Sequence, residues 1–156
     1  MNPAEEIVKF WLQINKYFMQ SSIRLPQNRE IDILAVDEDG NKSHIEVSVS
    51  VRMANYKMDA KQLAQEFYDR KFHSVEQEVK SRIGENYKKK LVVGKVSKGN
   101  TDISLEFIQE CKNLEIEVIL FQNILNEIRP LLLTNSHLNP IIKSVQLTEV
   151  FEKNSI

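Results

Sequence analysis

The stretch "REIDILAVDEDGNKSHIEVSVSVR", residues 29–52, alternates apolar and polar side chains with a period of two. Side chains on a β-strand point to opposite faces in turn, so this period predicts two strands, over 29–36 and 44–52. The intervening "DEDGNK" predicts a turn, because its Asp-Gly pair favours the positive φ of a tight hairpin. The stretch therefore predicts a β-hairpin with one apolar face on each strand.

Asp32 in the first predicted strand and Glu46 in the second each point away from the more apolar face of their strand. Carboxylates on neighbouring strands can share one Mg²⁺ or Mn²⁺ ion, since these cations prefer oxygen ligands. Such an ion can activate water and neutralise charge on a phosphodiester. Two solvated acids on a half-exposed hairpin would give the same pattern, so alternation alone leaves both interpretations open. His44 shares the strand face of Glu46, but a lone histidine at a strand start is usually exposed.

The rest of the chain supplies helices and further strands around this hairpin. Their order, α-β-β-β-α-β-α-β followed by helices, predicts an α/β fold with a mixed β-sheet and flanking helices. The last strand is a continuous apolar run, which is typical of a strand covered on both faces. The other predicted elements are a helix over 4–20, a strand over 23–25, a helix over 58–79 with a break near His73, a strand over 91–96, a helix over 101–114, a strand over 116–121 and two short helices between 123 and 151.

The length of 156 residues fits a single domain, 1–156, with a core over about 4–121 and a helical extension over about 123–156. The net charge of −1 excludes a globally basic nucleic-acid binder, but the charge is uneven. Residues 51–100 hold 12 Lys and Arg against 6 Asp and Glu, which gives +6. This basic block is either a pair of solvated helix faces or a surface for a phosphate backbone. Its candidate nucleic-acid-binding residues are Lys88, Lys89, Lys90 and Lys95.

The single cysteine, Cys111, allows no intramolecular disulfide, which favours a reducing cytoplasm. The first residues lack the basic and apolar regions of a signal peptide. The most apolar later stretch is interrupted by Glu, Gln, Asn and Arg, so we expect no membrane span. The expected location is cytoplasmic.

The segment "EIDILAV", with Asp32, and the segment "HIEVS", with Glu46 and Ser48, resemble the core of the PD-(D/E)XK nuclease superfamily. This superfamily includes many restriction endonucleases and Holliday-junction resolvases. The helix before the hairpin and the "KQLAQEFY" helix after it are also similar in order, so the resemblance covers about residues 4–121. It implies a restriction-endonuclease-like α-β-β-β-α-β core, metal-dependent cleavage of DNA or RNA, Mg (or Mn) as cofactor and a homodimer.

By this resemblance, Asp32 and Glu46 would be metal ligands and could act in catalysis. Glu6, or its neighbour Glu5, would be the acid that some family members add from the first helix. The chain departs from the family at Ser48, where the family has a lysine that orients water and stabilises charge at the phosphate. A serine hydroxyl carries no positive charge and cannot replace the electrostatic part of that role.

Some members of the family recruit a lysine from a neighbouring element, and Lys61 is the predicted substitute here. Lys57, four residues earlier, is the second candidate for this catalytic role, since the two lie on one side of a helix. Three functions therefore remain open. The chain is a metal-dependent nuclease, a catalytically inactive nucleic-acid-binding module of the same fold, or a protein-interaction domain.

Overall fold

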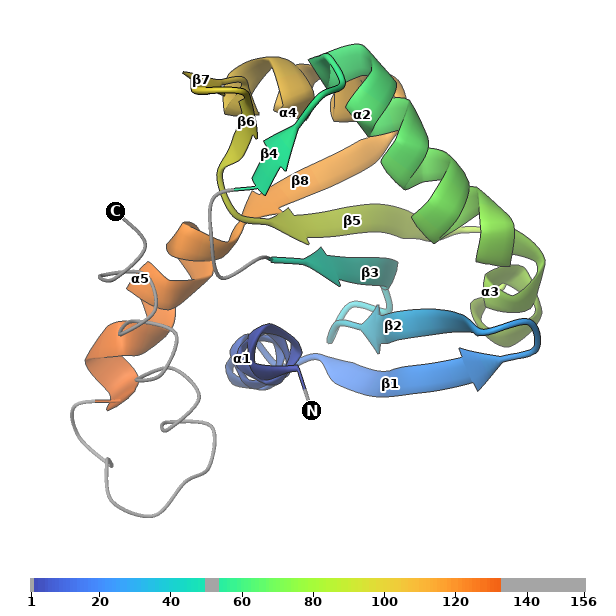
Figure 1. Ribbon diagram of the computed structural model, residues 1–156. Helices are drawn as coiled ribbons and strands as arrows, with labels where there is room; N and C mark the ends of the chain where they lie inside the picture. The colour runs from blue at the N-terminus through green and yellow to red at the C-terminus, as the bar shows by residue number, and fades with distance from the viewer. Residues whose placement is uncertain (1, 50–53, 133–156) are drawn as a thin grey trace.

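The computed structural model describes residues 2–49 and 54–132. A five-stranded sheet forms its centre, in the order β1-β2-β3-β5-β8 (Figure 1). The first three strands form an antiparallel meander, and the last three run parallel to one another. This arrangement confirms the predicted mixed sheet and is compatible with a restriction-endonuclease-like core. The strands are β1 (Phe18–Leu25), β2 (Arg29–Val36), β3 (Lys42–Ser48), β5 (Lys88–Val93) and β8 (Ile116–Leu120).

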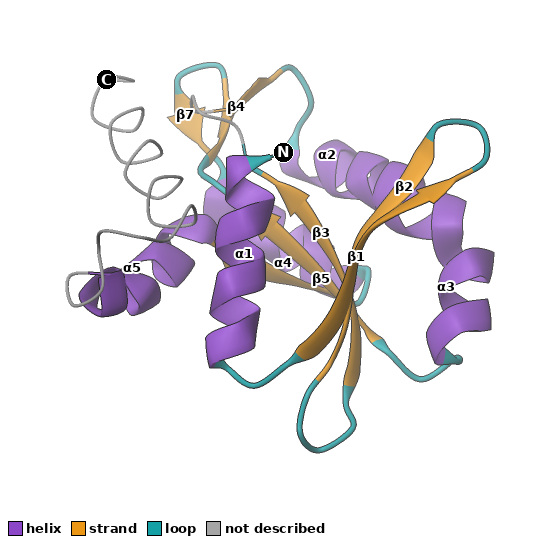
Figure 2. Ribbon diagram, turned by 90° about the horizontal axis from the view of Figure 1, so that it is seen from below, coloured by secondary structure: helices purple, strands orange, loops and turns teal. Residues whose placement is uncertain are grey.

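Helices cover both faces of this sheet, as the view from below shows (Figure 2). On one face, α1 (Pro3–Ile14) and α5 (Phe121–Leu132) pack on apolar side chains of β2 and β3. The other face is covered by α2 (Ala60–Phe67), α3 (Glu76–Ile83) and α4 (Ser104–Asn113). A second, small sheet consists of β4 (Ala54–Tyr56), β6 (Val96–Lys98) and β7 (Thr101–Asp102). Within residues 2–49 and 54–132, none of the helices is both long and apolar enough to span a bilayer.

Two irregular turns join α2 to α3: a π-helix, η1 (Tyr68–Phe72), and a 3₁₀ turn, η2 (His73–Val75). The predicted break near His73 is thereby confirmed. A π turn holds an extra residue, so it rotates the side chains that follow it, and such turns are frequent at functional sites. Here the segment places Phe72 in the core cluster that contains Leu91 of β5, and Val75 in the cluster that contains Ile31 of β2.

The first predicted helix is too long, because α1 ends at Ile14 and β1 begins at Phe18. Lys16 adopts a φ of 62°, which no helix can continue, and the backbone N–H of Tyr17 closes the turn onto the carbonyl of Leu12. The predicted strand over 23–25 is the far end of this longer strand. No glycine or proline stands at the helix end to reveal where α1 stops.

Several later boundaries also differ from the prediction. The apolar run in β8 forms an edge of the sheet and is only partly buried, so it is not covered on both faces. Residues 101–102 form β7, and α4 begins after them at Ser104. The predicted strand over 91–96 is divided between β5 and β6. The end of the strand predicted over 44–52 and the second of the helices predicted between 123 and 151 lie outside the described residues.

A capping box begins α2, and it gives a first test of the fold. Asp59 accepts a hydrogen bond from the backbone N–H of Gln62 at 2.8 Å, and the Gln62 side chain accepts one from the backbone N–H of Asp59. Asp59→Ala is expected to lower the free energy of unfolding by about 1 kcal/mol. Urea unfolding followed by circular dichroism measures this loss, and an unchanged midpoint would contradict the cap.

Candidate active site

The strands β2 and β3 separate at the point where the two acids lie. Their backbone ladder pairs residues 33–36 with 42–45 and goes no further. On the other side of β2, the ladder to β1 skips the pair Ser22–Asp32, and Ser22 has a φ of 53°. A kink of this kind explains why Ile31 packs toward α3 while Ile33 packs toward α1, although residues two positions apart on a regular strand share a face.

The two carboxylates fill the gap between the separated strands. Glu46 accepts a hydrogen bond from the backbone N–H of Asp32 at 3.3 Å, and Asp32 accepts one from the backbone N–H of Val47 at 2.8 Å. Each acid thus satisfies a donor on the opposite strand that the ladder leaves unpaired. The side chains are buried, with Asp32 6% and Glu46 0% exposed. The structure therefore brings the predicted pair together on one site.

His44 belongs to this site as well, and sequence reasoning missed it. Its Nε2 lies 2.7 Å from Glu46 Oε1, and its ring is fully buried between Phe72 and Tyr87. The expectation of an exposed histidine is wrong because η1 covers the start of β3. The two-residue spacing to Glu46 was the available signal, since it places both side chains on one face of the strand.

Lys71, in η1, is the cation that contacts the pair. Its Nζ lies 3.5 Å from Glu46 Oε2, and its side chain is 31% exposed. Sequence reasoning missed this lysine because it lies ten residues beyond Lys61, within a π turn that no periodicity reveals. Lys57 and Lys61 are exposed, and among the described residues neither forms an ion pair with Asp32 or Glu46.

Burial controls the charge of the site. It raises the pKa of Asp32 to about 6, with a further rise from the charge of Glu46. It also raises the pKa of Glu46 to about 7, and the nearby Lys71 only partly offsets this rise. Burial lowers the pKa of His44 to about 4, so its imidazole is neutral at pH 7. Two acids with raised pKa values are a pair that a divalent cation would deprotonate and stabilise.

The first helix brings an acid toward the pair, and it is Glu5. Burial raises the pKa of Glu5, and the charges of Asp32 and Glu30 raise it further. Glu6, the first choice from sequence, instead forms an ion pair with Lys9 on the helix surface. The direction of α1 decides between the two, since adjacent helical residues point about 100° apart.

The site fits a hard divalent cation only in part as it stands. Glu46 Oε2 is buried and has no hydrogen-bond partner in the described part of the chain, which makes it an acceptor available to a cation. Carboxylate oxygens are also the ligands that Mg²⁺ and Mn²⁺ prefer. Among residues 2–49 and 54–132, however, no group of three His, Cys, Asp or Glu side chains is already gathered around one point. Asp32 and Glu46 would hold the ion, with water completing its shell.

The strand β5 divides the candidate nucleic-acid-binding lysines. Lys89 lies on the face of Glu46, with its Nζ 5.7 and 5.8 Å from the ring centres of Tyr68 and Tyr87. Lys90 points to the opposite face, over Tyr17. Lys88 is exposed at the start of the strand, and Lys95 lies beyond its end. The four lysines therefore do not form one continuous surface, and Lys89 is the member beside the acids.

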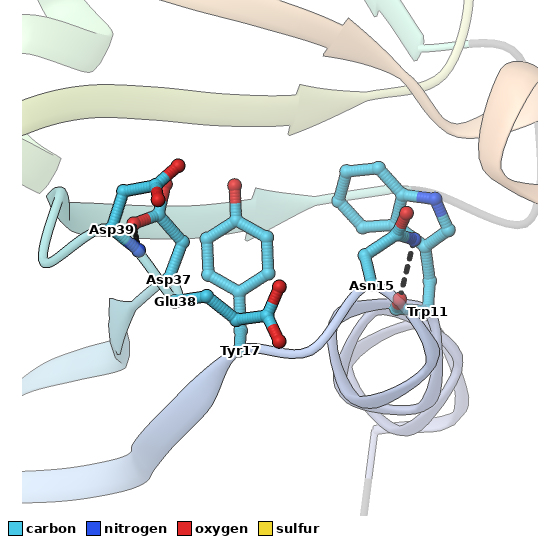
Figure 3. Close-up of a pocket in the computed structure, with 6 residues that line it drawn as sticks. All are labelled: Trp11, Asn15, Tyr17, Asp37, Glu38 and Asp39. Carbon is cyan, nitrogen blue, oxygen red and sulfur yellow. Dashed lines mark hydrogen bonds between the residues drawn. The ribbon is translucent and has the colours of Figure 1, made fainter.

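A pocket of about 290 Å³ lies elsewhere, beside the β2–β3 turn (Figure 3). One of the acids that line this pocket, Asp37, accepts hydrogen bonds from the backbone N–H groups of Asp39 and Asn41, so it stabilises the turn. Gly40, with a φ of 82°, completes the predicted hairpin turn. The pocket is at the other end of β2, about 16 Å along the strand from Asp32. It is lined by Trp11, Asn15, Tyr17, Asp37, Glu38 and Asp39.

Comparisons with known proteins bear on the fold alone. No protein-family model and no curated protein matches the chain. Among solved structures, a protein of unknown function, AF1548, is similar over 97% of this chain and 79% of its own, with a TM-score of 0.54 and 13% identity. That likeness shows a shared fold.

Two endonuclease structures are similar at a lower level. A repair endonuclease from Pyrococcus abyssi has a TM-score of 0.39 and 17% identity, over 72% of this chain and 44% of its own. EndoMS, in a complex with double-stranded DNA, has a TM-score of 0.41 and 13% identity, over 77% of this chain and 46% of its own. The chain therefore spans less than half of either endonuclease.

Proposed function

We propose that this domain is a metal-dependent phosphodiesterase of the PD-(D/E)XK type that cleaves DNA or RNA. The observation that carries the proposal is the buried pair Asp32 and Glu46, opposite each other where β2 and β3 separate, with Lys71 beside it. Burying two acids costs several kcal/mol per ion unless a cation compensates them. A pair of this kind is typical of a functional site, where carboxyl pKa values are displaced from their ordinary range.

In this proposal each group has a separate role. Asp32 and Glu46 would hold a Mg²⁺ or Mn²⁺ ion, which would supply an activated water and neutralise phosphate charge. Glu5 would add negative charge from α1. Lys71 supplies the positive charge that the family lysine has and Ser48 lacks, and it does so from the helical layer above the sheet.

Lys89 adds a second positive charge on the same sheet face as Glu46, beside the acids and Lys71. Among the described residues no carboxylate lies within salt-bridge distance of its ammonium, which two tyrosine rings hold in place. Such a preorganised cation suits a neighbouring phosphate of a nucleic-acid strand. In this proposal the other candidates, Lys88, Lys90 and Lys95, do not contact the bound nucleic-acid strand.

One observation favours a second function, a catalytically inactive nucleic-acid-binding module. Asp32 and Glu46 are almost wholly covered: Lys71 of η1 contacts Glu46, and Phe72 of η1 packs against the neighbouring His44. A phosphate reaches the pair only if η1 moves. If that movement does not occur, the basic surface binds nucleic acid without cleaving it.

The test is to incubate the pure protein with single-stranded DNA, double-stranded DNA and RNA, in Mg²⁺ or Mn²⁺ and in chelator. Cleavage that depends on the metal is the expected result. Binding that weakens steeply with salt, without cleavage, would select the second function. Neither cleavage nor binding would leave a protein-interaction domain. Sedimentation of the protein with and without nucleic acid would report whether a homodimer forms.

A further inference from the structure

His44 is a buried polar residue to which the proposed chemistry gives no role. Its ring has no exposed surface, and its Nδ1 has no hydrogen-bond partner within the described residues. An unpaired buried polar atom costs about 1–3 kcal/mol. A leucine would fill the space between Phe72 and Tyr87 without this cost. Packing alone therefore does not account for an imidazole at this position.

Within the described residues, the one hydrogen bond of the His44 side chain goes to Glu46, and it makes the two oxygens of that carboxylate unequal. Glu46 Oε1 lies 2.7 Å from His44 Nε2 and also accepts from the backbone N–H of Asp32 at 3.3 Å. Among residues 2–49 and 54–132, Glu46 Oε2 has no hydrogen-bond partner, and it faces Lys71 Nζ at 3.5 Å. In the tautomer that carries its proton on Nε2, His44 donates to Oε1 together with the backbone N–H of Asp32. Two donors on one oxygen fix the plane of the carboxylate, so Oε2 is the oxygen presented to the site.

We propose that His44 is a positioning residue: it holds Glu46 so that Oε2 points into the site, and thereby sets the affinity for a divalent cation. This inference rests on the proposed function. His44 is not itself a ligand here, because its Nε2 is occupied by Glu46 and its Nδ1 lies among aromatic rings. Partners that orient a metal ligand typically contribute 10–100-fold to metal affinity.

The experiment compares His44→Leu with His44→Gln by calorimetric titration of the metal-free protein with Mn²⁺. His44→Leu is expected to weaken Mn²⁺ binding by about 10–100-fold. The same variant is expected to leave the unfolding midpoint of the metal-free protein unchanged or higher, because it removes the unpaired Nδ1. A purely structural residue would not give these opposite directions.

His44→Gln should restore most of the affinity, because the glutamine amide nitrogen reaches the position of Nε2. If His44→Leu does not fold, His44→Asn replaces it, since the asparagine amide has the same chemistry and a shorter reach. The His44→Asn variant is then expected to bind Mn²⁺ weakly, whereas His44→Gln binds it well. The matched control is His73→Leu, which changes a histidine 65% exposed on η2 and should leave Mn²⁺ binding unchanged.

The outcomes separate the two proposals. If the unaltered protein binds no Mn²⁺, both the proposed function and the role of His44 are wrong. If it binds Mn²⁺ and His44→Leu binds equally well, the role of His44 alone is overturned. If His44→Gln is as weak as His44→Leu, the imidazole acts as a direct ligand, and positioning through Glu46 is again overturned.

Discussion

Asp32→Asn is expected to lower metal-dependent cleavage by at least about 10³-fold and to abolish the rise in unfolding midpoint that Mn²⁺ produces. Replacing a catalytic group that acts with its neighbours as a unit has effects of this size or larger. The amide keeps the volume of the carboxyl, and its oxygen can still accept from the backbone N–H of Val47. The fold should therefore persist. Initial cleavage rates and thermal unfolding with and without Mn²⁺ measure the two effects.

The same substitution should stabilise the metal-free protein at neutral and alkaline pH. The pKa of Asp32 rises from 3.8 to about 6 on folding, so the folded state binds more protons between these values. Stability from this group is therefore present at low pH and is lost as pH rises through about 6. Asp32→Asn removes that loss. The free energy of unfolding of the variant should therefore exceed that of the natural protein by an amount that grows from pH 4 to 6 and then stays constant. We expect a gain of about 1–2 kcal/mol at pH 8.

Urea unfolding in chelator at pH 5 and pH 8 measures this gain. His44 has the opposite dependence, since its pKa falls from 6.5 to about 4 on folding, but both proteins contain it and its effect largely cancels in the comparison. Glu38→Gln is the matched control, because Glu38 is an exposed acid on the turn of the same hairpin. Equal losses of cleavage in the two variants would show that Asp32 has no special role.

Lys71→Met is expected to reduce cleavage by about 10²–10³-fold, the usual effect of removing one group that stabilises transition-state charge. Mn²⁺ affinity should stay the same or increase, because the ammonium 3.5 Å from Glu46 Oε2 competes with a cation for that oxygen. Cleavage and metal binding thus move in different directions. Methionine retains the apolar stem, so packing of η1 over β3 is little changed.

Adding Ser48→Lys to Lys71→Met should recover part of the lost cleavage, because it returns a lysine to the position where the family has one. Lys61→Met is the control, since this exposed lysine was the sequence prediction and has no ion pair with the acids. If Lys61→Met loses as much activity as Lys71→Met, the assignment of the cation to η1 is wrong. If Ser48→Lys has no effect in either background, position 48, two residues after Glu46, does not face the reacting phosphate.

The sequence by itself determined the mixed sheet, the β2–β3 hairpin and the two acids on its strands. These features rest on local rules: strand alternation, an Asp-Gly turn and the order of helical and extended segments. It also located the break at His73. It did not reveal the end of α1, because a non-glycine residue with positive φ at Lys16 has no composition signal.

Only the tertiary structure decided which side chains join those acids. The kink at Ser22 and Asp32 separates β2 from β3, so each carboxylate bonds across the gap to the other strand. The π turn Tyr68–Phe72 places Lys71 beside Glu46, while the direction of α1 selects Glu5. These contacts join segments distant in the chain, and a shift of one residue in a helix changes which side chain points inward. The apolar period of the sequence does not reveal such a shift. The acids could therefore be predicted from the sequence, and their partners could not.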